Sequence, residues 1–169
     1  MFKNEQINID KLPTIESIVY KPVSKTYLKV LLFNRVIIYA IIMIVLFLLK
    51  QSSKFEKIEL SLVPMLIVIS LVFLLNSILT ILAFSKRGYA LRDHDVTYTK
   101  GLLVNKVITL PFIRIQHIEI SRSFLARKLK LATLNIYSAG DSGEDLSIKG
   151  LPINVANNLK DHITSKLNE

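Results

Sequence analysis

Two long apolar runs dominate the pattern of the first half of the chain. Residues 60–84 contain no charged side chain, and residues 30–49 carry only one, Arg35. A helix over 60–84 would be about 37 Å long, which is enough to cross a hydrocarbon core of ~30 Å with some tilt. The pattern therefore predicts a transmembrane helical hairpin at residues 23–86, with spans at about 30–49 and 60–84.

One arginine and two asparagines fall inside the predicted spans. Asn34 and Arg35 lie near the start of the first span, and Asn76 lies at a similar depth in the second. Polar groups within a membrane are costly and usually have a role. We expect interhelical polar contacts that hold the hairpin together. The alternative is a place on a conduction or lipid path, which would make the protein a small oligomeric pore subunit.

From residue 88 onward the chain alternates with the two-residue period of strands. The isoleucines of residues 113–120 share one face only if a bulge interrupts the strand near Gln116 and His117, because their spacing shifts there. Glycine, proline and aspartate residues separate the alternating stretches. Six or seven short strands are expected, including residues 89–92, 96–100, 106–110, 114–121, 132–138 and 146–150.

Two stretches of the second half favour helices instead. Residues 123–129 fit one or two helical turns, and the spacing of Val155, Leu159 and Ile163 predicts an amphipathic helix over 152–167. Short strands followed by one such helix are typical of a small barrel, or of two packed sheets, with the helix covering an open end. The sequence thus predicts a membrane hairpin followed by a small all-β or α+β domain at residues 87–169.

Positive charge outside the spans gives the hairpin a predicted orientation. The 169 residues include 22 Lys and Arg against 13 Asp and Glu, a net charge of +9. Basic residues flank both outer ends of the hairpin, whereas the connector at 51–59 mixes lysines with glutamates. Since such charge favours the cytoplasmic side, we expect both termini inside, with residues 1–22 forming a cytoplasmic N-terminal arm.

Catalytic chemistry finds little support in the sequence. The chain has no cysteine, which excludes thiol nucleophiles and zinc–thiolate sites. It has no glycine-rich phosphate loop and no metalloprotease or serine-hydrolase motif. His94 lies between Asp93 and Asp95, but three successive side chains on a tight turn cannot easily converge on one metal ion. We expect no enzyme, no metal and no cofactor, and no nucleic-acid partner.

A basic cluster without acidic neighbours is the clearest candidate for a binding surface. We expect it to contact anionic lipid or a partner, and the alternative is that its charge only reflects cytoplasmic placement. The cluster consists of Arg122, Phe124, Arg127, Lys128 and Lys130.

Several stretches of the second half carry a family resemblance: YALRDHDVTYTKGLL, then LPFIRIQHIEISRSFLARKLKLATLNIYSAG, and IKGLP before the terminal helix. They resemble the bacterial pleckstrin-homology-like (PH-like) domain, and the whole chain resembles the YdbS-like membrane proteins, in which two spans precede one such domain. One position departs from the family pattern: Lys130 stands where a glycine is usual, between Leu129 and Leu131.

The resemblance implies a barrel of two nearly orthogonal sheets capped by the C-terminal helix, in the plasma membrane of a bacterium, and it supplies no reaction. It also implies a membrane protein partner, such as a larger protein with related domains, and a link to envelope stress or bacteriocin tolerance. The expected function is a non-enzymatic, membrane-anchored scaffold. The alternative is a module that recognises lipid headgroups or assists their transport, and a homo-oligomer is compatible with either.

Overall fold

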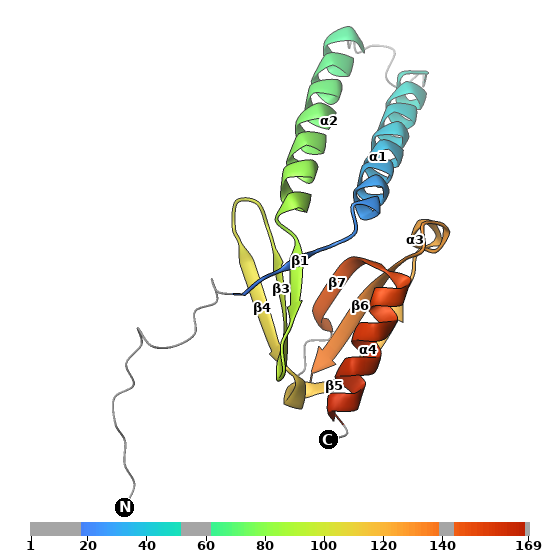
Figure 1. Cartoon of the computed structure of the whole chain (residues 1–169). Coiled ribbons are helices and arrows are strands. Elements are labelled where there is room, and N and C mark those ends of the chain that lie inside the picture. The colour runs from blue at the N-terminus through green and yellow to red at the C-terminus, as the bar shows by residue number, and fades with distance from the viewer. Residues whose placement is uncertain (1–17, 52–61, 139–143, 168–169) are drawn as a thin grey trace, which may run out of the picture.

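The computed structural model describes residues 18–51, 62–138 and 144–167 of the chain. Two long helices form a hairpin on top of a small β domain (Figure 1). The predicted arm lies outside the described residues up to residue 17, and so does most of the connector between the spans. The elements are β1 (Lys21–Pro22), α1 (Thr26–Gln51), α2 (Leu62–Ser85), β2 (Gly88–Leu91), β3 (Asp95–Lys100), β4 (Lys106–Pro111), η4 (Phe112–Arg114), β5 (Ile115–Ser121), α3 (Phe124–Lys128), β6 (Leu131–Ser138), β7 (Glu144–Pro152) and α4 (Ile153–Leu167).

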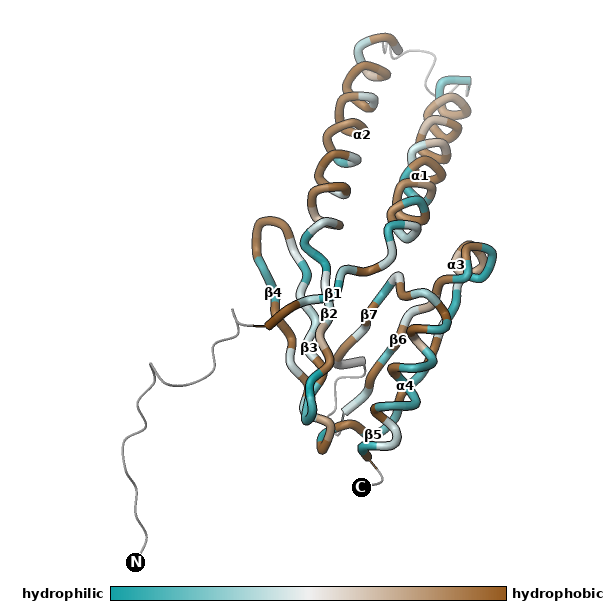
Figure 2. The backbone as a smooth tube through the Cα atoms, viewed as in Figure 1, coloured by the Kyte–Doolittle hydropathy of each residue, from teal (hydrophilic) through white to brown (hydrophobic). Residues whose placement is uncertain are grey.

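Helices α1 and α2 consist mostly of apolar residues, drawn brown in Figure 2, and most of their large apolar side chains are exposed. Only 6% of the most apolar window of α1 is buried, and none of that of α2. A helix in the core of a soluble protein would be mostly covered, so these two need an apolar surrounding. Between them, the rings of Tyr39 and Phe73 meet edge to face with centroids 4.9 Å apart.

The β domain consists of two antiparallel sheets, one with the order β1-β2-β3-β4 and one with the order β5-β6-β7. Together they form an open, barrel-like sandwich, and α4 packs against β5, β6 and β7. The predicted combination of a hairpin with a small barrel capped by a C-terminal helix is confirmed. The core holds side chains from both sheets and from α4, among them Val96, Tyr98, Leu134, Ile136, Ile148 and Ile163, each at most 2% exposed.

The barrel begins before the hairpin does. Lys21 and Pro22 pair with Tyr89 and Gly88 of β2, and Val23 is buried in the core at 3% exposure. The sequence predicts an arm that ends at residue 22 and a hairpin that starts at residue 23. In the structure, Lys21 and Pro22 form a short strand of the β domain, and Val23 is part of its core.

The isoleucine pattern predicts the bulge in β5 correctly but misplaces Ile113. The predicted bulge is confirmed, because the register with β6 shifts between Ile115 and His117. The expectation that Ile113 shares a face with the other isoleucines is wrong, since its side chain is 93% exposed whereas that of Ile115 is buried. The chain turns through η4 there, which buries the neighbouring Phe112 at 5% exposure instead.

Helix α3 begins and ends through local chemistry. Ser123 caps it, with its Oγ accepting a hydrogen bond from the Ala126 N–H at 3.3 Å. Lys130 then adopts a left-handed backbone with a φ of 54°, the one non-glycine with positive φ among the described residues. A left-handed residue after a helix is usually a glycine, which explains why the family pattern has glycine at this position.

Candidate functional site

The barrel and α1 meet at Tyr27 and Gly150. Gly150 lies in β7 with a φ of +81°, and a Cβ atom there would lie only 2.3 Å from Cγ of Tyr27. The backbone N–H of Ser24 donates a hydrogen bond to the Gly150 oxygen at 3.0 Å. The N–H of Thr26 in turn donates to Oγ of Ser24 at 3.3 Å, which caps α1. The glycine therefore lets the first turn of the membrane helix pack directly on the barrel.

Helix α2 enters the barrel with an equally short connection. Phe84 in its last turn packs against the core, and the guanidinium of Arg87 lies 5.9 Å from the centre of the Tyr27 ring. Gly88 follows as the first residue of β2, where a Cβ would lie 2.9 Å from Cβ of Tyr20. With both helices joined to the barrel in this way, the orientation of the barrel relative to the hairpin is fixed.

The β3–β4 turn carries apolar side chains at the end of the barrel that faces the helices (Figures 1 and 2). Leu103 is 93% exposed and Val104 is 68% exposed. The turn is built by Gly101, which has a φ of +116°, and by a hydrogen bond of 2.9 Å from Oγ1 of Thr99 to Oδ1 of Asn105. Hairpin turns normally carry polar residues, so this turn has the composition of a surface that contacts something apolar.

A pocket of about 420 Å³ lies between the two helices and this turn. It brings together Arg35 of α1 and Asn76 of α2, the arginine and one of the two asparagines within the predicted spans. Asn34 is exposed and does not line it. No hydrogen bond joins the side chains of these three residues in the part of the chain that the structure describes, so their interhelical contact stays a prediction. The pocket is lined by Leu31, Arg35, Asn76, Leu79, Thr80, Ala83, Arg87, Leu102 and Leu103.

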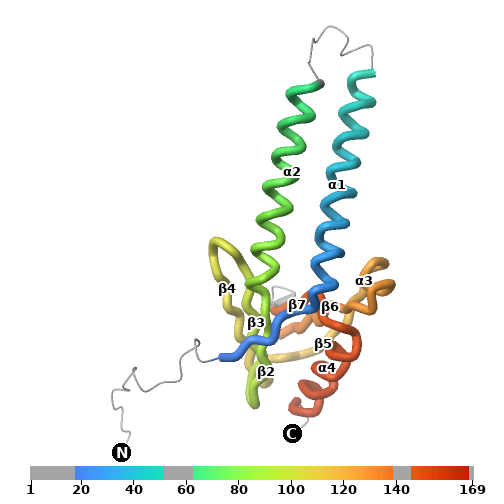
Figure 3. The backbone as a smooth tube through the Cα atoms, turned by 45° about the horizontal axis from the view of Figure 1, so that its top comes forward, coloured from blue at the N-terminus to red at the C-terminus, as the bar shows by residue number. Residues whose placement is uncertain are grey.

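The predicted basic cluster lies on and around α3, beside the barrel-side end of α1 (Figure 3). Phe124 is 63% exposed, and Nζ of Lys128 lies 5.0 Å from its ring centre. Arg122 instead holds the backbone: its Nε donates to the Leu131 oxygen at 3.2 Å and its Nη2 to the Arg127 oxygen at 3.3 Å. Arg127 and Lys130 are exposed. The cluster therefore contains a structural arginine and four residues available for contact.

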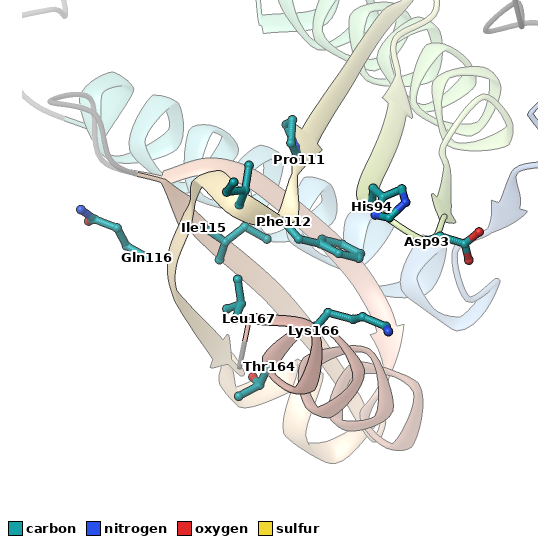
Figure 4. A pocket seen from close by; sticks show the side chains of 10 residues that line it. Asp93, His94, Pro111, Phe112, Ile115, Gln116, Thr164, Lys166 and Leu167 are labelled. Atoms are coloured by element: carbon teal, nitrogen blue, oxygen red, sulfur yellow. The ribbon is translucent and has the colours of Figure 1, made fainter. Parts of the chain in front are cut away.

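A larger pocket of about 1050 Å³ lies at the opposite end of the barrel, between η4, β5 and the end of α4 (Figure 4). The exposed Ile113 lines it together with the buried Phe112. Polar groups at its rim include His94 and Lys166. The sequence gives no sign of this pocket, because the isoleucine pattern grouped Ile113 on one face with the other isoleucines of residues 113–120.

Two groups of titratable residues in the barrel are held by contacts with each other. The guanidinium of Arg92 holds Asp95 through two hydrogen bonds, of 2.7 and 2.5 Å, across the β2–β3 turn. This hydrogen bonding raises the pKa of Arg92. The ring of His117 stacks on Tyr137, whose hydroxyl donates to Oε2 of Glu119 at 3.1 Å. Within the described residues, no three His, Asp or Glu side chains are grouped so that they could hold a metal ion.

Two apolar helices joined to a PH-like barrel define a class: membrane proteins with a bacterial PH-like domain. The chain matches the family model described as "Bacterial PH domain" over residues 28–167, and it belongs to this family. It is 30% identical over 102 residues to the UPF0699 transmembrane protein YdbS of Bacillus subtilis (strain 168). That match covers 57% of this chain and 62% of the relative, so the chain spans less than two thirds of the relative's length. No solved structure matches it significantly.

Proposed function

We propose that the protein is a non-enzymatic, membrane-anchored adaptor of the bacterial plasma membrane. The hairpin holds the barrel at the cytoplasmic leaflet, and the barrel assembles with a membrane protein partner. A larger protein with related PH-like domains is the natural candidate for this partner. The basic residues outside the spans support the cytoplasmic placement.

The observation that carries the proposal is the difference between the two ends of the barrel. The end at the helices is occupied by the junction, whereas the far end presents Ile113, 93% exposed, beside a pocket of about 1050 Å³. Exposed apolar side chains at the edge of a partly apolar pocket are typical of protein-interaction surfaces. This end points away from the hairpin (Figure 1) and is therefore the part that a partner could reach.

The test is co-purification of the full-length, tagged protein in mild detergent, with mass spectrometry of what accompanies it. Ile113→Glu should remove a stoichiometric partner, because it places a charge at the centre of the contact. Val19→Glu is the matched control, since Val19 is also apolar and 88% exposed but lies before β1. A partner that survives Ile113→Glu, or one lost equally in both variants, would contradict this surface.

A second function, contact with lipid headgroups, is favoured by the apolar tips at the helix end of the barrel. Leu103 lies beside the end of α2 and Phe124 beside the end of α1, and Lys128 accompanies Phe124. Basic residues close to an anionic leaflet contribute about 1 kcal/mol each. Reversal of Arg127 and Lys128 to Glu in the full chain should weaken retention of anionic lipid, whereas reversal of Lys160 and Lys166 on α4 should not.

A further inference from the structure

The pocket between α1, α2 and the β3–β4 turn lies along the barrel-side halves of the two helices. Arg35 follows the first residue of α1 by nine positions, and Asn76 precedes the last residue of α2 by nine. Both are thus about 14 Å from the barrel-side end of their helix. Arg87 lies just beyond the end of α2 and lines the same pocket. An arginine at this depth of a membrane-spanning helix can extend its long side chain toward the headgroups.

Among the described residues, no acidic side chain balances the positive charge of this pocket. Arg35 and Arg87 both line it, and no aspartate or glutamate is among its described lining residues. No ion pair to either arginine is formed within the part of the chain that the structure describes. An unpaired guanidinium inside a membrane-spanning segment is costly, so an anion from outside the protein would stabilise this arrangement.

The remaining walls suit a lipid rather than a small soluble ion. Leu31 and Leu79 provide apolar surface from the two helices, and Leu102 and Leu103 provide it from the β3–β4 turn. The side-chain amide of Asn76 adds a hydrogen-bond donor between them. Two cations and one neutral donor beside apolar walls match a phosphodiester whose acyl chains continue along the helices.

We propose that this pocket binds the phosphate of an anionic phospholipid of the leaflet that faces the barrel. Arg35 and Arg87 hold the phosphate, and the β3–β4 turn closes over the glycerol side of the lipid. The inference rests on the membrane placement in the proposed function, but it does not depend on the partner surface at Ile113. Bound lipid would therefore link hairpin and barrel at a point where the described residues provide no acidic partner for Arg35 or Arg87.

The experiment uses the full-length protein in mild detergent, with bound lipids counted by native mass spectrometry during titration with phosphatidylglycerol. Arg35→Gln and Arg87→Gln should each weaken binding about tenfold or more, as expected for the loss of a charge-assisted hydrogen bond. Arg35→Lys should retain part of the affinity. Lys29→Gln and Lys50→Gln are matched controls, because both residues are exposed on α1 and outside the pocket. Asn76→Leu keeps both cations and should weaken binding to a lesser degree. Circular dichroism verifies that each variant is folded.

Three further arms separate the possible occupants. Phosphatidylethanolamine should bind several-fold more weakly than phosphatidylglycerol, and inorganic phosphate should compete poorly. Equal retention of the two lipids, or equal losses in pocket and control variants, would overturn the proposal. Displacement of the lipid by inorganic phosphate would assign the site to a free anion, and a dimer that forms without lipid would assign it to a second copy of the chain. Failure in any of these arms leaves the co-purification test of Ile113 unaffected, so the two proposals fail separately.

Discussion

The ring of Tyr27 lies against Gly150 so closely that a Cβ atom on the glycine would come within 2.3 Å of Cγ and 2.6 Å of Cβ of the tyrosine. Tyr27 belongs to the first turn of a membrane helix and Gly150 to the last strand of the barrel. This contact, together with the hydrogen bond from Ser24 to Gly150, couples the two halves of the protein. Movement of the hairpin relative to the barrel would have to break it.

Gly150→Ala should therefore destabilise the protein by about 2–4 kcal/mol, since it combines overpacking with a positive φ that disfavours a side chain. The melting temperature of the purified full chain in one detergent is the measurement. Lys149→Ala on the same strand is the control, because that side chain is exposed, and it should change stability little. If Gly150→Ala behaves like the control, the close contact with Tyr27 does not exist in solution.

Lys130→Gly should stabilise the protein by about 0.5–1 kcal/mol. Lys130 has a φ of 54°, and this left-handed conformation costs a residue with a side chain about 1–2 kcal/mol, part of which glycine loses again as backbone entropy. Lys128→Gly, two residues earlier and within α3, should instead destabilise by about 1 kcal/mol. The two glycine variants thus differ in the sign of their effect on the melting temperature, and a shared sign would contradict the geometry.

Arg122→Ala should destabilise the protein by about 1–3 kcal/mol, because its guanidinium donates to the carbonyl oxygens of Leu131 and Arg127. Arg127→Ala removes the same charge from an exposed side chain and should leave the melting temperature nearly unchanged. If both variants lowered the retention of anionic lipid equally and neither altered stability, Arg122 would belong to the contact surface rather than to the support of α3.

Alkaline pH should destabilise the barrel through Tyr98. Burial raises the pKa of Tyr98 above its ordinary value of 10.0, because it disfavours the phenolate in the folded state. The unfolded chain therefore loses this proton at lower pH than the folded one, and the free energy of unfolding falls as the pH rises above about 10. The stabilising contribution is complete below that pH.

The Tyr98→Phe variant tests this directly, because it cannot ionise at position 98. Its melting temperature should fall less steeply than that of the natural protein when the pH is raised through the same range. Part of the dependence should remain, since burial also raises the pKa of Tyr89. Identical pH profiles of the two proteins would show that Tyr98 ionises equally easily in both states.

The parts of the fold that depend on periodicity could be predicted from the sequence. The spans, most of the strands and α4 follow from the spacing of apolar residues, and the bulge near His117 follows from a shift in that spacing. Ile113 could not be placed in this way, because its exposure depends on a single 3-10 turn that interrupts the pattern. Lys130 was visible as a departure from the family pattern, but its positive φ became clear only from the structure.

The candidate sites could be predicted only in part. Arg35 and Asn76 stood out as polar residues within apolar spans, but Arg87 read as an ordinary flanking charge. Its place in the same pocket depends on how α2 joins the barrel. The apolar residues 102–104 could have indicated a contact surface from the sequence alone, because hairpin turns are normally polar. That this turn lies beside α2 could be learned only from the structure.

In the proposed arrangement, one end of the barrel contacts the membrane and the other end is presented to a partner. Leu103 and Ile113 test this arrangement directly, because both are 93% exposed within the protein, Leu103 beside the helices and Ile113 beside the end of α4. The chain contains no cysteine, so Leu103→Cys and Ile113→Cys each introduce a single reporter thiol. Both variants are reconstituted in anionic vesicles and labelled with a membrane-impermeant maleimide, with detergent-solubilised samples as the reference.

In detergent-free vesicles the cysteine at position 103 should be protected from the aqueous label, and a fluorophore attached there should be quenched by nitroxide lipids. The cysteine at position 113 should be labelled readily wherever the barrel faces the reagent, and its fluorophore should not be quenched by lipid. Equal labelling and equal quenching at the two positions would contradict the claim that the β3–β4 turn faces the membrane while the end at Ile113 is presented to a partner.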